Sequence, residues 1–360
     1  MTARTRTFVL LVPAVVMTFA CAERTIVSPR AEAQVAFGAA AVLPFDALGL
    51  HAPGLPGAGC AAPQYRQFDF WLGQWEVIDP TGTTFQGTNI IESELDGCVV
   101  EENWTGAGGV SGRSINFYDA SADVWSQMWV AAGGGLGGVL LLEGGLVGES
   151  MVMSGTRVFA DFGGFTVEDT IAWTLLPDRT VRQFWTTTPN IGIFDGRYHR
   201  RPSVTPPEEV FIPTCSQRPS SRELDFLLGS WVLRPGSSED LAGGAVTSLV
   251  TTDLNECLIE ERISGPGGYE GWSFAAWSAI DHDWHRTYVD NTGRRLVLRG
   301  GMTGDAMVMS GQHRSANGGT IDVRISWRPG AAGEVEQRWE LSRDGGATWR
   351  LDRSVRYVKQ

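Results

Sequence analysis

The stretch FDFWLGQW at residues 68–75 returns as LDFLLGSW at residues 224–231, and both copies end in Gly-x-Trp. The segments that follow also repeat in the same order. For example, CVVEENWTG at 98–106 matches CLIEERISG at 257–265, and MVMSG occurs unchanged in both halves. The offset between matching segments stays between 154 and 159 residues. The chain therefore contains a tandem duplication of a unit of about 140 residues.

The N-terminus has the features of an export signal. Two arginines in MTARTRT precede an apolar core at residues 8–20, which is too short to span a bilayer, and small residues surround Cys21. These features predict a signal peptide over residues 1–22 and a location in the periplasm or the cell envelope. TFAC at 18–21 resembles a bacterial lipobox, although Thr18 stands where an aliphatic residue is usual. Lipid attachment to Cys21 and ordinary cleavage therefore both stay open.

The rest of the chain divides around the repeat. Residues 23–59 are rich in Ala, Gly and Pro and are expected to form a flexible tether, and residues 202–214 form a Pro-rich linker. The two repeated units then span residues 60–201 and 215–360. The net charge of −12 argues against nucleic acid as a partner, because its phosphates would repel the chain. Beyond the signal, no stretch approaches the ~20 apolar residues of a membrane helix, so membrane contact is expected only through an N-terminal lipid.

The cysteines follow the duplication. Cys60 and Cys98 flank the first octet at nearly the same distances as Cys215 and Cys257 flank the second, and Cys21 is left over in the signal region. In an exported protein this arrangement predicts two disulfides, Cys60–Cys98 and Cys215–Cys257, one within each unit. A metal site is the alternative, but no CxxC pair or histidine cluster accompanies these cysteines.

Within each unit, apolar residues alternate with polar ones. Cys98, Val100, Glu102 and Trp104 share one face of a predicted strand, and Gly-rich turn signals separate it from other short runs of the same kind. Glycine is abundant, with 45 residues in 360. Many short strands with Gly-rich turns in about 140 residues predict a β-sandwich or a small closed barrel.

The octet decides between the two by resemblance. Phe-x-Phe-x-Leu-Gly-x-Trp near a domain start is similar to the opening of lipocalin-like (calycin) barrels, in which the Trp packs at the closed end beneath an Arg of the last strand. The resemblance implies two tandem lipocalin-like antiparallel β-barrels, with Trp75 and Trp231 as plugs and Arg197 and Arg356 as the covering arginines. The fuller pattern, with GC-x-x-E-x-W-x-G and G-x-S-x-N-x-YD, resembles an uncharacterised bacterial family of exported proteins, which brings no established activity.

Polar residues on the inward stripes are the candidate site, because a barrel of this size either fills its interior or leaves one ligand cavity. Glu102 is central, since an unpaired buried carboxylate is costly. Unit two keeps the equivalent Glu261 but replaces Gln127 with Arg286, which predicts an ion pair that closes its interior. A purely structural hydrogen-bond network stays open as the alternative reading of these residues. The ligand-binding residues expected in unit one are Glu102, Trp104, Ser114, Asn116, Gln127, Trp129, Gln183 and Trp185.

Three functions compete for this arrangement. The first is a non-catalytic binder of a small, largely apolar molecule in barrel 1, which is the preferred interpretation. The second is an envelope interaction module with filled barrels, and the third is a cofactor-independent isomerase or cyclase that uses Glu102 as its acid–base group. No cofactor is expected: His199 lacks the motif of haem-binding barrels, and the HDWH turn at 282–285 has no histidine counterpart in unit one. The sequence does not indicate an oligomeric state.

Overall fold

The computed structural model describes residues 59–132, 138–188, 191–207, 215–235, 245–314 and 319–360. The predicted signal peptide at 1–22, Cys21, nearly all of the tether and residues 208–214 of the linker lie outside the described residues. Among the described residues, no helix has the length and apolar character needed to cross a bilayer.

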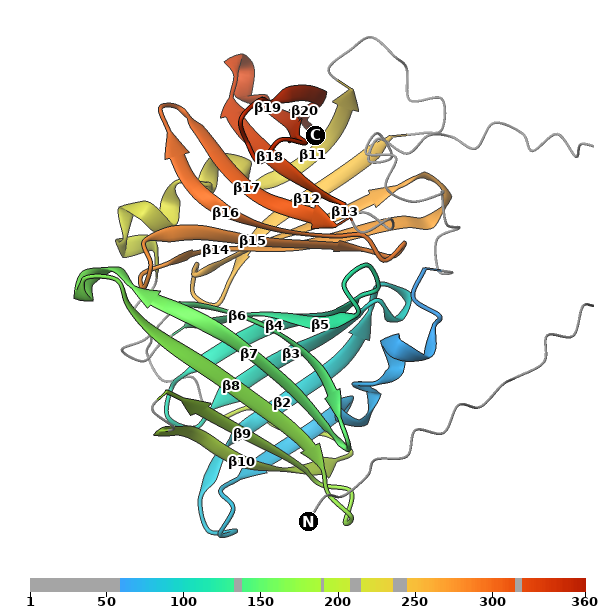
Figure 1. Ribbon diagram of the computed structural model, residues 1–360, viewed down its shortest axis with the longest axis vertical. Helices are drawn as coiled ribbons and strands as arrows, with labels where there is room; N and C mark the ends of the chain where they lie inside the picture. Colours follow the sequence, from blue (N-terminus) through green and yellow to red (C-terminus); the bar gives the residue numbers. More distant parts are fainter. Residues whose placement is uncertain (1–58, 133–137, 189–190, 208–214, 236–244, 315–318) are drawn as a thin grey trace, which may run out of the picture. The chain divides into compact units, whose positions relative to one another are not determined.

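The first unit is a closed barrel of ten antiparallel strands in which each strand pairs with the next and β1 pairs with β10 (Figure 1). This order follows from the alternating strands and short turns of the sequence, because antiparallel neighbours need only a tight turn between them. The strands are β1 Gly73–Ile78, β2 Phe85–Glu94, β3 Val99–Gly106, β4 Ser111–Asp119, β5 Val124–Ala132, β6 Val139–Val147, β7 Ser150–Phe159, β8 Phe165–Leu175, β9 Val181–Thr187 and β10 Ile191–Arg201.

The second unit repeats this architecture as a second closed barrel of ten antiparallel strands. We call the two units barrel 1 and barrel 2. The strands of barrel 2 are β11 Gly229–Pro235, β12 Val246–Asp253, β13 Leu258–Gly265, β14 Tyr269–Ser278, β15 Asp283–Asp290, β16 Arg295–Thr303, β17 Ala306–Arg314, β18 Thr320–Pro329, β19 Val335–Ser342 and β20 Arg350–Lys359. The predicted all-β fold with two tandem barrels is therefore confirmed.

The octets form a short 3-10 turn that leads into the first strand of each barrel. In barrel 1, Phe68, Trp71 and Trp75 are fully buried, and Trp75 Nε1 donates a hydrogen bond of 2.8 Å to the carbonyl oxygen of Trp71. In barrel 2, Trp231 is equally buried and donates to the carbonyl oxygen of Leu227 at 2.7 Å. A buried indole that also satisfies its N–H ties the turn to the barrel.

The cations that cover these tryptophans are not the predicted ones. The Arg200 guanidinium lies 4.3 Å from the centre of the Trp75 ring, and Lys359 Nζ lies 5.1 Å from that of Trp231. The prediction of Arg197 and Arg356 is wrong because of strand register, which places Arg200 directly opposite Trp75 and on the same face.

Both predicted arginines lie elsewhere. Arg197 is opposite Ile78, and its side chain bonds Thr180 and Asp178. Arg356 is exposed and lies opposite Arg234.

Both predicted disulfides are confirmed. Cys60 bonds Cys98 with a Cα–Cα distance of 5.0 Å, and Cys215 bonds Cys257 with a Cα–Cα distance of 4.9 Å. Each one ties the segment before its octet to the start of the third strand of its barrel.

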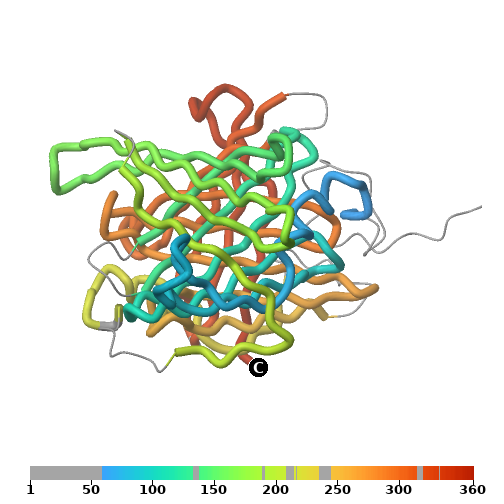
Figure 2. Tube along the Cα trace, turned by 90° about the horizontal axis from the view of Figure 1, so that it is seen from below, coloured from blue at the N-terminus to red at the C-terminus, as the bar shows by residue number. Residues whose placement is uncertain are grey.

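The β7–β8 hairpin, drawn in green, extends beyond its neighbouring strands in both views (Figures 1 and 2).

Candidate ligand-binding site

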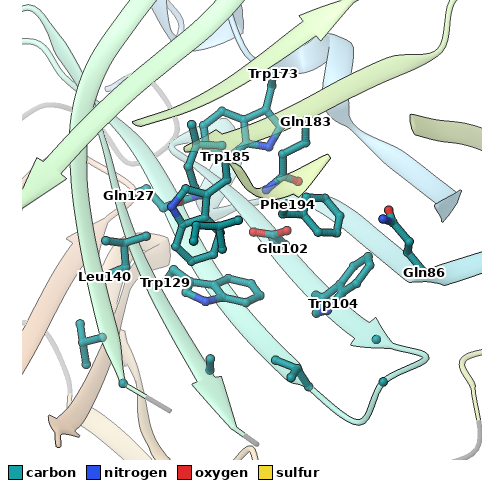
Figure 3. A pocket seen from close by; sticks show the side chains of 18 of the residues that line it. Gln86, Glu102, Trp104, Gln127, Trp129, Leu140, Trp173, Gln183, Trp185 and Phe194 are labelled. Atoms are coloured by element: carbon teal, nitrogen blue, oxygen red, sulfur yellow. The ribbon is translucent and has the colours of Figure 1, made fainter. Parts of the chain in front are cut away.

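Barrel 1 encloses a cavity of about 540 Å³. Its lining extends to Phe85, Ala107 and Gly108, so the cavity reaches the end of the barrel where β1 leads into β2 and β3 into β4, opposite to the Trp75 plug. The wall is mainly aromatic and aliphatic, with a few polar groups that converge on it (Figure 3). The aromatic and aliphatic residues that form most of it are Trp104, Trp129, Leu140, Ile171, Trp173, Trp185 and Phe194.

Strand register brings the polar groups together. Glu102 on β3 lies opposite Ser114 on β4, and Asn116, two residues further along β4, lies opposite Gln127 on β5. Because side chains alternate along each strand, all four point to the interior. The period-two stripes of the sequence were enough to predict this row.

The Glu102 carboxyl is deeply buried and points into the cavity (Figure 3). It accepts two hydrogen bonds from neutral groups: Asn89 Nδ2 donates to Oε1 at 2.7 Å, and Ser114 Oγ donates to Oε2 at 2.8 Å. In the part of the chain that the structure describes, no cationic side chain forms an ion pair with it. Burial therefore raises the pKa of Glu102 to about 7, although the bonds from Asn89 and Ser114 oppose the rise.

A second layer of amides fixes the donors to Glu102. Asn116 Nδ2 donates to Ser114 Oγ and to the Val100 carbonyl oxygen, both at 2.9 Å. Gln127 Nε2 in turn donates to Asn116 Oδ1 at 2.7 Å. Ser114 and Asn116 are not among the residues that line the cavity. Their hydrogen bonds hold the side chains of Glu102 and Gln127 in place.

The opposite side of the polar row ends at Tyr198 on β10. Its hydroxyl donates to Gln183 Oε1 and accepts from Asn89 Nδ2 at 3.4 Å. Both Tyr198 and Gln183 line the cavity. They connect the β2–β3 side of the site with the β9–β10 side and give the polar wall a fixed orientation.

One further charged pair reaches the cavity and is internally neutral. Arg157 binds Asp169 through two hydrogen bonds of 2.6 and 2.7 Å, and Trp185 Nε1 donates to the same carboxylate at 2.7 Å. Asp169 is fully buried. The pair therefore fixes one tryptophan of the wall and leaves Glu102 as the unpaired acid of the cavity.

Barrel 2 has a filled interior, with a void of only about 20 Å³. Glu261 accepts from Ser248 Oγ at 2.7 Å and from the Tyr357 hydroxyl at 3.1 Å, and it forms an ion pair with Arg286. The ion pair that the sequence predicted is therefore present. The Arg286 guanidinium also lies 5.0 Å from the centre of the Trp327 ring.

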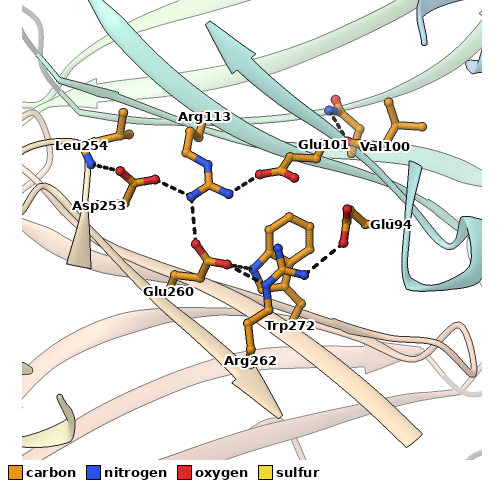
Figure 4. Close-up of polar contacts among 10 residues, drawn as sticks. Glu94, Val100, Glu101, Arg113, Asp253, Leu254, Glu260, Arg262 and Trp272 are labelled. Atoms are coloured by element: carbon orange, nitrogen blue, oxygen red, sulfur yellow. Dashed lines mark hydrogen bonds and ion pairs between the residues drawn. The ribbon is translucent and has the colours of Figure 1, made fainter. Parts of the chain in front are cut away.

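The acidic residues next to these two glutamates face the other way. Glu101 in barrel 1 forms an ion pair with Arg113. In barrel 2, Glu260 accepts from Arg262 Nε at 2.6 Å and from Trp272 Nε1 at 2.8 Å (Figure 4). Glu101 and Glu260 therefore each have an arginine partner, whereas Glu102 forms no ion pair with any of the described residues.

Six of the eight predicted site residues line the cavity: Glu102, Trp104, Gln127, Trp129, Gln183 and Trp185. Sequence reasoning missed Asn89, Trp173, Phe194 and Tyr198. Asn89 lies opposite Trp75, and its only sequence signal is a polar residue on an inward position of the second strand. Trp173 and Trp327 are equivalent, since each lies opposite the first Met of MVMSG in its barrel. Aligning the two repeats at these tryptophans could therefore have identified Trp173.

The other candidate centres gain no support. Among the described residues, no group of three or more His, Cys, Asp or Glu side chains is arranged to hold a metal ion. His199 lies opposite Glu76 on the outward side of β10, since its neighbour Tyr198 faces the interior. His285 Nε2 is 2.9 Å from Asp281 Oδ2, and Arg299 forms an ion pair with the same carboxylate at 3.2 Å.

Comparisons with known proteins add little. No family model and no curated protein matches the sequence. The solved structures that are similar include a crystal structure of "a putative outer membrane protein" from Bacteroides fragilis NCTC 9343, with 10% identity over 82% of this chain and 99% of that chain. The TM-score is 0.18. At that value the likeness carries no argument about the site.

Proposed function

We propose that this is an exported protein whose first barrel binds a small, largely apolar molecule and orients it through Glu102. The observation that supports this most directly is the contrast between the interiors of the two barrels, with a cavity of about 540 Å³ inside one and about 20 Å³ inside the other. A volume of several hundred Å³ with aromatic walls and a few convergent polar groups is typical of a small-molecule site. The two disulfides favour an oxidising compartment such as the periplasm.

Barrel 2 serves as a supporting module in this proposal. Its interior is occupied by its own side chains, among them the Glu261–Arg286 pair. The duplicated fold therefore offers one open and one filled copy, and barrel 2 is a control inside the same molecule.

The test is a titration with the neutral probe N-phenyl-1-naphthylamine, whose fluorescence rises in apolar surroundings. Ala131 lines the cavity near its mouth, so Ala131→Trp should block entry and reduce probe affinity by at least about 10-fold. Val147→Trp is the matched control, because Val147 is exposed at the far end of β6. Absence of saturable binding, or equal binding by both variants, would contradict the proposal.

Proton transfer is a second candidate function. A cavity carboxyl with a pKa of about 7 can act as both acid and base near neutral pH. If a substrate is found, Glu102→Gln should then abolish turnover while the affinity for the neutral probe stays unchanged. Unchanged turnover in this variant would exclude the catalytic role.

A further inference from the structure

The two barrels place a glutamate at the same position, opposite a serine of the next strand. Glu102 pairs across the sheet with Ser114, and Glu261 pairs with Ser273. Each also accepts a hydrogen bond from the strand that precedes it, from Asn89 in barrel 1 and from Ser248 in barrel 2. The duplication has therefore kept an inward carboxyl in both copies, and the two can be compared directly.

The copies differ in the cation. Strand register makes Gln127 the equivalent of Arg286, because Gln127 lies opposite Asn116 and Arg286 lies opposite Ala275, two residues beyond the respective serines. In barrel 2 the guanidinium bonds Glu261 and lies over Trp327. In barrel 1 the amide of Gln127 carries no charge and is hydrogen-bonded to Asn116.

The other partner of the cation is still present in barrel 1. Trp173 is the equivalent of Trp327 by strand pairing, and it lines the cavity together with Glu102. Barrel 1 therefore keeps the carboxyl and the indole between which barrel 2 places a guanidinium, and both groups line the cavity. Carboxylates bind cations through charge-assisted hydrogen bonds, and among aromatic rings the tryptophan face attracts cations most, especially in a desolvated site.

We propose that the ligand of barrel 1 is an organic cation, a protonated amine on an apolar body, whose charged group takes the position that Arg286 occupies in barrel 2. This inference rests on the proposed function, since it names the chemical class of the molecule that the cavity holds. The ammonium would bind Glu102 and lie against Trp173, while the apolar body would contact Trp104, Trp129 and Phe194 nearer the mouth.

The charge balance of the cavity agrees with a cationic guest. Besides Glu102, the titratable groups that line the cavity or bind its lining are Tyr198, Arg157 and Asp169, and the last two neutralise each other. Asn89, Ser114, Gln127 and Gln183, which come from the surrounding strands, are neutral. An ionised Glu102 therefore leaves the site one positive charge short, and an ammonium supplies it.

The first experiment compares three ligands that share one apolar body: 1-naphthalenemethylamine, 1-naphthalenemethanol and 1-naphthoic acid. At pH 8, calorimetric titration of the full chain should give at least 10-fold tighter binding of the amine than of the alcohol, with the acid weakest. Glu102→Gln should remove this preference and leave the affinity for the alcohol within about 3-fold. Lowering the pH to 5.5 should weaken amine binding, because Glu102 is then protonated.

A second experiment supplies the cation from the protein. Gln127→Arg should recreate the arrangement of barrel 2 and reduce amine affinity by at least 10-fold without lowering the melting temperature at pH 8. Gln127→Met is the matched comparison, since it also removes the amide and is similar in length but uncharged, and the arginine variant should bind the amine at least 10-fold more weakly than the methionine variant does.

The outcomes separate the two levels of the proposal. Equal affinity for the amine and the alcohol, or tighter amine binding at pH 5.5 than at pH 8, would overturn the proposal that the ligand is a cation. In that case, binding of N-phenyl-1-naphthylamine would still support the proposed function. If neither the naphthalene series nor that neutral probe binds, the proposed function falls as well.

Discussion

Replacing Glu102 with glutamine should make barrel 1 more stable at neutral pH in the absence of ligand. The pKa of Glu102 is raised from 4.5 to about 7 by burial, so the folded state prefers the protonated carboxyl. Its contribution to stability is fully present below pH 4.5 and is lost as the pH rises through 7. Each pKa unit between 4.5 and 7 corresponds to 1.36 kcal/mol of stability, so the total loss is about 3 kcal/mol.

The glutamine variant lacks this pH dependence. Its amide can accept from only one of the two donors, Asn89 and Ser114, and the other bond is lost at every pH at a cost of about 1 kcal/mol. We therefore expect Glu102→Gln to be slightly less stable than the wild-type barrel at pH 4.5 and about 2 kcal/mol more stable at pH 8.

Hydrogen exchange measured on peptides from β3 and β4 is the suitable assay, because it reports barrel 1 separately from barrel 2. The control is Glu261→Gln, read on peptides from β13 and β14. That change deprives Arg286 of its partner and should destabilise barrel 2 at both pH values. A stability difference for Glu102→Gln that stays constant from pH 4.5 to 8 would refute the assignment of Glu102 as a desolvated, unpaired carboxylate.

Three further predictions concern the framework of the barrels. Arg286→Met should destabilise barrel 2 by about 3–5 kcal/mol, because it leaves Glu261 buried without its cation. Adding Glu261→Gln should recover part of that loss. If hydrogen exchange shows that the two single effects simply add, the Glu261–Arg286 ion pair does not stabilise the barrel. Trp75→Ala should lower the free energy of unfolding by about 3–5 kcal/mol, because the indole is fully buried. Arg197→Ala should change it by less than about 1 kcal/mol, since the ion pair of Arg197 with Asp178 is exposed. Equal losses for the two variants in urea unfolding would support Arg197 as the residue that covers Trp75. Changing both Cys60 and Cys98 to serine should lower the stability of barrel 1 by about 3–4 kcal/mol, because the disulfide closes a loop with a sequence separation of 38. An unchanged unfolding midpoint would contradict a structural role for this disulfide.

The sequence by itself determined the features that depend on local order. Two copies of the octet and of the cysteine pair predicted two units with one disulfide each, and period-two alternation predicted strands with Glu102 facing inward. These features depend on side-chain alternation and on spacing along the chain, both of which can be read without knowing which strands are neighbours. The predicted ion pair of Glu261 with Arg286 also belongs here, because the repeat aligned the two units.

Only the tertiary structure decided what depends on register and on packed volume. Arg200 covers Trp75 in place of Arg197 because a shift of three residues between β1 and β10 changes both the partner and the face. Asn89 and Tyr198 joined the site in the same way, from strands far apart in the chain. Whether a barrel is open or filled depends on the summed volumes of all inward side chains against a fixed enclosure, so similar stripes gave about 540 Å³ in one barrel and about 20 Å³ in the other.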